Sequence, residues 1–136
     1  MMDEEKARAL GLKPMMRFVD YATVGVDPRY MGIGPVPSTQ KLLKRNGMTV
    51  ADVDFFELNE AFSSQSIACI RELNLDIDKV NMYGGAIALG HPYSATGINL
   101  AAKAAAIFKH KGGERCVITF CVGGGQGVAC LFENCD

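Results

Sequence analysis

The chain has 136 residues, which is enough for one domain with a hydrophobic core of its own. Its composition, with 49% hydrophobic and 21% charged residues, is that of an ordinary globular protein. A net charge of −1 gives no electrostatic reason to bind nucleic acid or an anionic membrane, and no apolar run reaches the ~20 residues that would span a bilayer.

The N-terminal part of the chain predicts a short helix, a long strand and a second helix. Residues 3–8 begin with acidic and end with basic side chains, before Gly11, as short helices do. Residues 15–26 are rich in β-branched and aromatic side chains and predict a strand. The next helix is expected from Ser38, a capping residue, to Asn46, which precedes a glycine.

Strands and helices alternate in the rest of the chain. The predicted elements are, in order, a strand at 53–58, a helix at 61–73, a strand at 80–83, a helix at 97–111, and strands at 115–120 and 128–132. The order βαβαβαββ predicts an α/β fold, a five-stranded mixed sheet that is mostly parallel, with helices on both faces. The final hairpin is expected to add an antiparallel edge.

The longest helix is apolar on nearly every side. Between residues 98 and 108 its only polar side chains are Asn99 and Lys103, and five positions are alanine. A single sheet covers only one face of such a helix, so we expect a second layer from another domain or another copy of the chain. A homo-oligomer is the simplest form, with Lys103 at the rim of the contact.

The five cysteines are an odd number and show no Cys-x-x-Cys spacing, which argues against a disulfide framework and a structural zinc site. Cys69, Cys116 and Cys130 stand in apolar stretches and are expected to be buried, whereas Cys135 is expected to be exposed. We therefore expect no bound metal, and a reducing, cytoplasmic compartment.

A glycine-rich loop, Cys-Val-Gly-Gly-Gly-Gln-Gly at residues 121–127, joins the two terminal strands. Glycines allow backbone amides to approach a ligand closely, because no Cβ stands in the way. A cysteine at the edge of such a loop places a thiol beside amide donors. By itself the pattern is more typical of a tight hairpin beside a buried cysteine.

Two further motifs stand where a strand passes into a helix, the place where α/β sheets collect functional residues. They are Asn-Glu-Ala-Phe at 59–62 and Gly-Gly-Ala-Ile-Ala-Leu-Gly-His-Pro at 84–92. With the loop at 121–127 and the segment at 27–37, they resemble the C-terminal half of a thiolase in order and spacing. The resemblance runs from about Ala7 to Glu133, so residues 1–136 are interpreted as one thiolase C-terminal domain.

The resemblance implies an enzyme that makes or breaks a carbon–carbon bond between acyl groups carried on coenzyme A. Cys121 matches the acid/base cysteine of the family. His91 matches the histidine that donates to the thioester oxygen, and Asn59 matches the asparagine that holds a water beside it. Gly123 matches a glycine whose N–H binds the acyl oxygen. These four residues are the predicted catalytic residues.

Other positions carry weaker expectations. Met31 and Phe62 match residues that line the acyl pocket of short-chain thiolases, although either could be ordinary core. Glu60 is interpreted as structural, and Asn59 could also cap the helix at 61–73. Coenzyme A thioesters are the expected substrates, and no permanently bound cofactor is expected.

Two departures from the family pattern follow the His-Pro pair. Tyr93 and Ser94 stand where the family has an aliphatic residue and a glycine, which puts the acyl preference and the loop geometry in question. Nothing in the chain resembles the N-terminal half of a thiolase or its nucleophilic cysteine. We therefore expect the chain to need that half, or a second copy of itself, as a partner.

Two alternative functions remain open on the sequence. The chain could be a non-catalytic interaction module that pairs with itself or with another chain. It could also belong to a ketoacyl synthase, but that class places a histidine or an asparagine at the position of Cys121. The presence of Asn59, His91, Cys121 and Gly123 together favours the enzyme, because an unused site is free to lose them.

Overall fold

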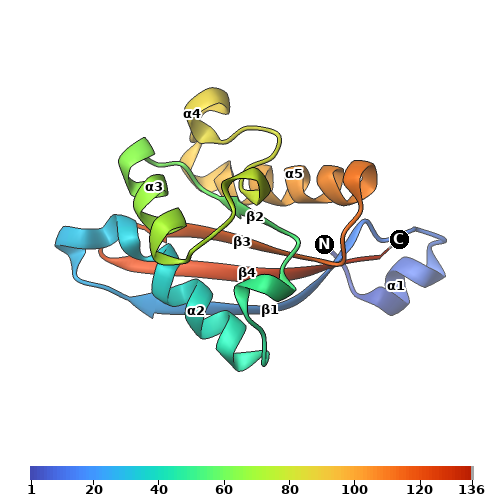
Figure 1. The fold of residues 1–136 in the computed structure, drawn as a ribbon. Helices are drawn as coiled ribbons and strands as arrows, with labels where there is room; N and C mark the ends of the chain where they lie inside the picture. Colours follow the sequence, from blue (N-terminus) through green and yellow to red (C-terminus); the bar gives the residue numbers. More distant parts are fainter. Residues whose placement is uncertain (136) are drawn as a thin grey trace.

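The computed structural model describes residues 1–135, which form a four-stranded sheet with helices on both faces (Figure 1). The strands are β1 (Met16–Gly25), β2 (Phe55–Leu58), β3 (Arg115–Val122) and β4 (Gln126–Asn134). The α-helices are α1 (Glu4–Ala9), α2 (Pro35–Arg45), α3 (Ser63–Glu72), α4 (Ala86–Leu89) and α5 (Thr96–Lys111). Short 3-10 helices are η1 (Pro28–Ile33), η2 (Val50–Asp52), η3 (Ile77–Lys79) and η4 (Tyr93–Ala95). None of the helices within residues 1–135 is long and apolar enough to cross a membrane.

The terminal hairpin lies in the middle of the sheet, because the strand order is β1-β4-β3-β2. Only β2 and β3 are parallel, while β4 runs antiparallel to both β1 and β3. The prediction of a mostly parallel sheet with the hairpin at its edge was therefore wrong. Residues Cys116–Thr119 of β3 are all buried, and a strand buried on both faces takes a central position.

The predicted fifth strand at 80–83 is reduced to one bridge between Val80 and Phe56. Asn81 has a φ of 50°, so the backbone turns away directly after the bridge. Its side chain also occupies the edge of β2, where Oδ1 accepts from Leu58 N at 2.9 Å and Nδ2 donates to Leu58 O at 2.8 Å. The prediction of five strands was wrong because this asparagine replaces the ladder bonds that would continue the pairing.

Two hydrophobic clusters hold the layers together, one on each face of the sheet. Helices α2 and α3 cover one face, where Leu42 and Cys69 pack in the same cluster as Leu131. Helix α5 covers the other face, where Phe108 meets Phe55 edge-on with ring centroids 4.9 Å apart. Figure 1 shows α5 on the side of the sheet opposite α2. The expectation of helices on both faces is confirmed.

Two helix starts differ from the prediction. Helix α2 begins at Pro35, three residues before Ser38, and the Ser38 hydroxyl donates back to Gly34 O at 2.9 Å. Proline is favoured in a first helical turn, where its missing N–H is not needed. Helix α3 has Phe62 as its N-cap residue, so the interpretation of Asn59 as the cap of this helix was wrong.

Helix α5 is partly covered by its own sheet. Leu100, Ala104, Ile107 and Phe108 are buried against it. Lys103 does not lie at an outer rim, as the sequence suggested, because its Nζ lies 2.5 Å from Oε2 of the buried Glu57. The polar stripe of the helix therefore faces the sheet in part, and the remaining exposed apolar face is smaller than the sequence implied.

Candidate active site at the carboxyl ends of β2 and β3

Asn59 and Cys121 lie at the same end of two neighbouring parallel strands. Leu58, the last residue of β2, is paired with Thr119 of β3, and Asn59 N donates to Thr119 O at 2.9 Å. Cys121 lies on β3, two residues after Thr119. Carboxyl ends of parallel strands meet at one edge of a sheet, which is where such folds place ligands. The structure thus brings together two of the four predicted catalytic positions.

The carboxamide of Asn59 is buried, with 1% of the residue exposed. Its Oδ1 has no hydrogen-bond partner anywhere in residues 1–135. A buried acceptor without a partner costs about 1–3 kcal/mol, so this oxygen is suited to receive a donor from a water or a ligand. Asn59 borders a cavity of about 270 Å³ that is lined by Gly85, Ala86, Leu89, Gly90, Thr96, Asn99, Leu100, Ala102 and Lys103.

His91 lies in the loop between α4 and α5, where its imidazole ring contacts Thr96 and Tyr93. Its Nδ1 lies 2.6 Å from the hydroxyl of Thr96, which itself lines the 270 Å³ cavity. The imidazole stacks on the ring of Tyr93, with centroids 4.8 Å apart. With Nδ1 engaged by Thr96, Nε2 is the ring nitrogen left for a ligand.

Glu60 supports the segment that leads to His91. Its Oε1 accepts from Asn81 Nδ2 at 2.9 Å, and its Oε2 accepts from the amide of Ile87 in the first turn of α4 at 3.0 Å. Gly85 lies so close that a Cβ there would stand 2.1 Å from the carboxyl carbon of Glu60. These contacts agree with a structural role for Glu60 and explain the glycine at position 85.

The loop after Cys121 combines two closely packed glycines, Gly125 and Gly127, with two open ones, Gly123 and Gly124. Gly125 has a φ of 92°, and a Cβ there would lie 2.5 Å from Val26 O. Gly123 is exposed, and a Cβ there would meet nothing within 4 Å among the described residues. The backbone at Gly123 is therefore accessible at the edge of the sheet, as an amide that binds an acyl oxygen would need to be.

The Cys121 thiol is half-buried, and burial raises its pKa above the ordinary value. Among the described residues, the one influence that lowers its pKa is a hydrogen bond with its own backbone. An acid/base thiol works best when its pKa is near the working pH. The described residues thus place the thiol but do not lower its pKa.

Met31 and Phe62, the predicted acyl-pocket residues, do not line the 270 Å³ cavity. Met31 is half-buried in η1, and Phe62 is exposed at the start of α3. Phe62 is therefore not part of the hydrophobic core, which was the alternative interpretation of this residue.

Three residues near the cavity were not predicted as functional, namely Glu57, Thr96 and Lys103. Glu57 could have been found, because a carboxylate within the apolar strand Phe-Phe-Glu-Leu faces inward together with Phe55. Thr96 and Lys103 gave no such signal, because their partners are distant in the chain.

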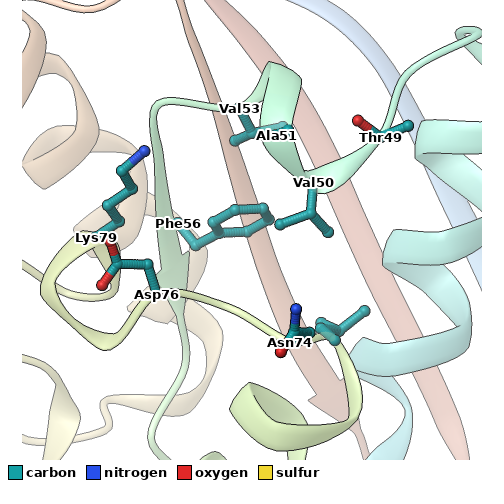
Figure 2. Close-up of a pocket in the computed structure, with 9 residues that line it drawn as sticks. Thr49, Val50, Ala51, Val53, Phe56, Asn74, Asp76 and Lys79 are labelled. Atoms are coloured by element: carbon teal, nitrogen blue, oxygen red, sulfur yellow. The ribbon is translucent and has the colours of Figure 1, made fainter.

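A larger cavity of about 410 Å³ lies toward the amino end of β2 and contains none of the predicted site residues. Figure 2 shows Phe56 at its centre, beside Val50 and Val53. The side chain of Asp76, at its rim, accepts from the amide of Asp78 at 3.0 Å and so caps η3. This cavity is a gap between η2 and the α3–η3 connection rather than a candidate site.

Among residues 1–135, no group of three or more His, Cys, Asp and Glu side chains is arranged to hold a metal ion. The five cysteines are all free thiols, and Cys135 is the exposed one. The polar groups of the site are amides, a thiol, an imidazole, the Thr96 hydroxyl and the Lys103 ammonium group with its partner Glu57. The amides, the thiol and the imidazole suit acid/base chemistry and the binding of a carbonyl oxygen.

Comparison with known proteins identifies related sequences. The sequence pattern described as "Thiolase, C-terminal domain" matches residues 12–134. A 3-ketoacyl-CoA thiolase of Bacillus subtilis is 50% identical over 135 residues, which are 99% of this chain and 34% of that protein.

Two solved structures share the fold. The acetyl-CoA acetyltransferase of Bacillus anthracis superimposes with a TM-score of 0.94 and 44% identity, over 98% of this chain and 34% of that one. Human mitochondrial 3-ketoacyl-CoA thiolase gives a TM-score of 0.94 and 41% identity, again over 98% of this chain and 34% of that one. The chain spans about a third of the length of these relatives. This chain belongs to the thiolase family and corresponds to its C-terminal domain.

Proposed function

We propose that this chain supplies the acid/base cysteine and one oxyanion-binding site of a thiolase that transfers acyl groups between coenzyme A thioesters. The reaction is the condensation of acetyl-CoA or the thiolysis of a 3-ketoacyl-CoA. The observation that carries the proposal is the buried Asn59 Oδ1, which has no hydrogen-bond partner among residues 1–135. It borders a cavity at the carboxyl end of β2, next to β3, on which Cys121 lies one residue before the end.

His91 and Asn59 are the proposed groups that stabilise an enolate. The thioester oxygen of the substrate gains negative charge when a proton leaves its α-carbon, and a hydrogen-bond donor at this oxygen stabilises that charge. When the Thr96 hydroxyl donates to Nδ1 of His91, the proton of the neutral ring is on Nε2, which donates to the thioester oxygen. Asn59 Oδ1 accepts from a water whose second hydrogen is donated to the same oxygen.

Cys121 is the proposed acid/base group. In condensation, its thiolate takes a proton from the α-carbon of one acyl-CoA, and the carbanion attacks the carbonyl carbon of an acyl group held as a thioester on a second cysteine. The C–S bond to that cysteine breaks, and its sulfur leaves as a thiolate. The N–H of Gly123 binds the acyl oxygen, and Met31 and Phe62 contact the acyl chain.

The second cysteine is proposed to come from another part of a complete thiolase. Cys69 does not suit that role, because burial raises its pKa to about 11 and its Sγ lies 3.5 Å from Gly32 O. We therefore propose that this chain works with a thiolase N-terminal part and is inactive without it. The free thiols at residues 69, 116, 121, 130 and 135 fit a reducing, cytoplasmic compartment.

The test combines the purified chain with the N-terminal part of a thiolase relative and measures CoA-dependent cleavage of acetoacetyl-CoA. We expect no turnover by the chain alone and turnover by the combination. Cys121→Ala should reduce turnover by about 10²–10⁴-fold and His91→Ala by about 10²–10³-fold. Cys135→Ala, at the exposed thiol, is the matched control and should have no effect.

Two results would contradict the proposal. One is turnover by the chain alone that disappears when one of its own cysteines is replaced. The other is wild-type turnover by a combination that carries Cys121→Ala. Stable pairing without turnover would favour the alternative of a non-catalytic interaction module.

A further inference from the structure

A buried ion pair between Glu57 and Lys103 lies beside the candidate site. The Glu57 side chain is 0% exposed and the Lys103 side chain 15% exposed, with Lys103 Nζ 2.5 Å from Glu57 Oε2. Glu57 Oε1 has no hydrogen-bond partner among the described residues. Glu57 lies two residues before Asn59 on the same face of the sheet, and Lys103 lines the same cavity as Asn59.

The ammonium group of Lys103 has a second partner, because its Nζ also donates to Gly84 O at 2.6 Å. Gly84 has a φ of 83° and begins the segment that runs through α4 to His91. One side chain of α5 therefore connects β2 to the start of this segment. From the other side, Glu60 Oε2 accepts from Ile87 N in the same segment.

Stability alone does not account for such a pair. Removing two charges from water is expensive, and a well-packed apolar pair of similar size is often as stable or more stable. Burial raises the pKa of Glu57, Lys103 opposes this shift, and the nearby charge of Glu60 adds to it. Burial raises the pKa of the Cys116 thiol on β3, and the charge of Glu57 adds to this shift. Lys103 thus favours the ionised form of Glu57 against the effect of burial.

We propose that Lys103 and Glu57 are a positioning pair that fixes the segment 84–91, and with it the imidazole of His91, relative to Asn59. This role rests on the proposed function of the site. Neither residue touches a reacting atom, and both act through the segment. The ion pair fixes the position of the Gly84 carbonyl group. Because segment 84–91 connects Gly84 to His91, the position of Gly84 in turn limits where the imidazole can lie.

The test measures amide hydrogen exchange in the purified chain, segment by segment. Lys103→Met keeps the length of the side chain but removes both contacts, so exchange in segment 84–91 should become about tenfold faster. Amides of α2 and β4 should keep their wild-type rates. Lys109→Met, on the exposed side of the same helix, is the matched control and should change nothing.

The double variant and the pH separate positioning from a general loss of stability. In Lys103→Met the carboxylate of Glu57 loses its counter-charge, so the ratio of the exchange rate to that of wild type should rise as the pH rises and Glu57 ionises. The double variant Glu57→Gln, Lys103→Met also removes the carboxylate. The ratio of its exchange rate to that of wild type should therefore be smaller than for Lys103→Met and should not change with pH. If Lys103→Met does not fold, Glu57→Gln alone should still speed exchange in segment 84–91 by about threefold.

Equal exchange in Lys103→Met and Lys109→Met would overturn the proposal, and so would a uniform increase over all segments. In the active combination described above, Lys103→Met should lower kcat while KM stays within about twofold. A combination that is inactive with the wild-type chain would favour the non-catalytic interaction module over the proposed function. The exchange data would still decide whether the pair fixes the segment.

Discussion

The imidazole of His91 stacks on the phenol ring of Tyr93, with centroids 4.8 Å apart and planes inclined by 27°. Tyr93 reaches this position with a φ of 42°, which is rare for a residue with a side chain. Unusual backbone of this kind concentrates at functional sites. We also expect Tyr93, together with Ser94, to depart from the thiolase pattern in this loop.

Tyr93→Leu should free the His91 ring and lower the turnover of the complete site by about 3–10-fold, as expected for the loss of one aromatic pair. Tyr93→Phe keeps the ring and should retain turnover. The stacking itself is measurable in the chain alone, because the ring current of Tyr93 shifts the NMR signals of the imidazole. Equal losses in the Leu and Phe variants would assign the effect to the hydroxyl group instead.

Gly127→Ala should destabilise the chain, because a Cβ at this position would lie 1.9 Å from the carbonyl oxygen of Gly34. Relieving this overlap requires backbone movement between β4 and the start of α2, at a cost of about 1–3 kcal/mol. We expect a drop in Tm of at least about 4 °C. Gly123→Ala is the control for stability, since its Cβ would meet nothing within 4 Å, and an equal drop in both variants would contradict this explanation.

Glu133 should make stability depend on pH. Its carboxylate accepts a hydrogen bond from Arg17 and lies 3.5 Å from Arg115 Nε, and the Arg17 bond first of all lowers its pKa. A lowered folded-state pKa stabilises the fold above the unfolded pKa of about 4.3, and this contribution is lost as the pH falls through the folded value.

Glu133→Gln should therefore lower the free energy of unfolding by about 0.2–1 kcal/mol at pH 7 and by nothing at low pH. Urea unfolding at several pH values measures this difference. A constant difference down to the acid limit would mean that the charge of Glu133 is not its cause.

Helix α5 still offers an apolar contact, because Ile98 is 72% exposed beside the exposed Ala102. The chain should therefore self-associate in the absence of a partner part, most simply as a twofold dimer. Ile98→Asp should shift light scattering to the monomer mass, whereas Ile77→Asp, at a site 67% exposed on η3, should leave the mass unchanged. A compact wild-type monomer at micromolar concentration would refute the dimer.

Much of the local structure could be predicted from the sequence. The order of acidic and basic residues located α1, runs of helix-forming residues located α3 and α5 to within a few residues, and β-branched runs located the four strands. The order and spacing of the motifs identified the family. Their glycines, Asn59, His91 and Cys121 stand at or near strand and helix ends. These features depend on neighbours in the chain, so the sequence alone determined them.

The sheet order and the support of the site were decided by the tertiary structure. Local periodicity does not say which strands pair, so β4 between β1 and β3 could not be predicted, nor that Asn81 would end the pairing of Val80 after one bridge. The contact between Glu57 and Lys103 joins a strand to a helix far along the chain. Such contacts depend on how the folded elements pack, because a charge is buried only where packing brings its partner within reach.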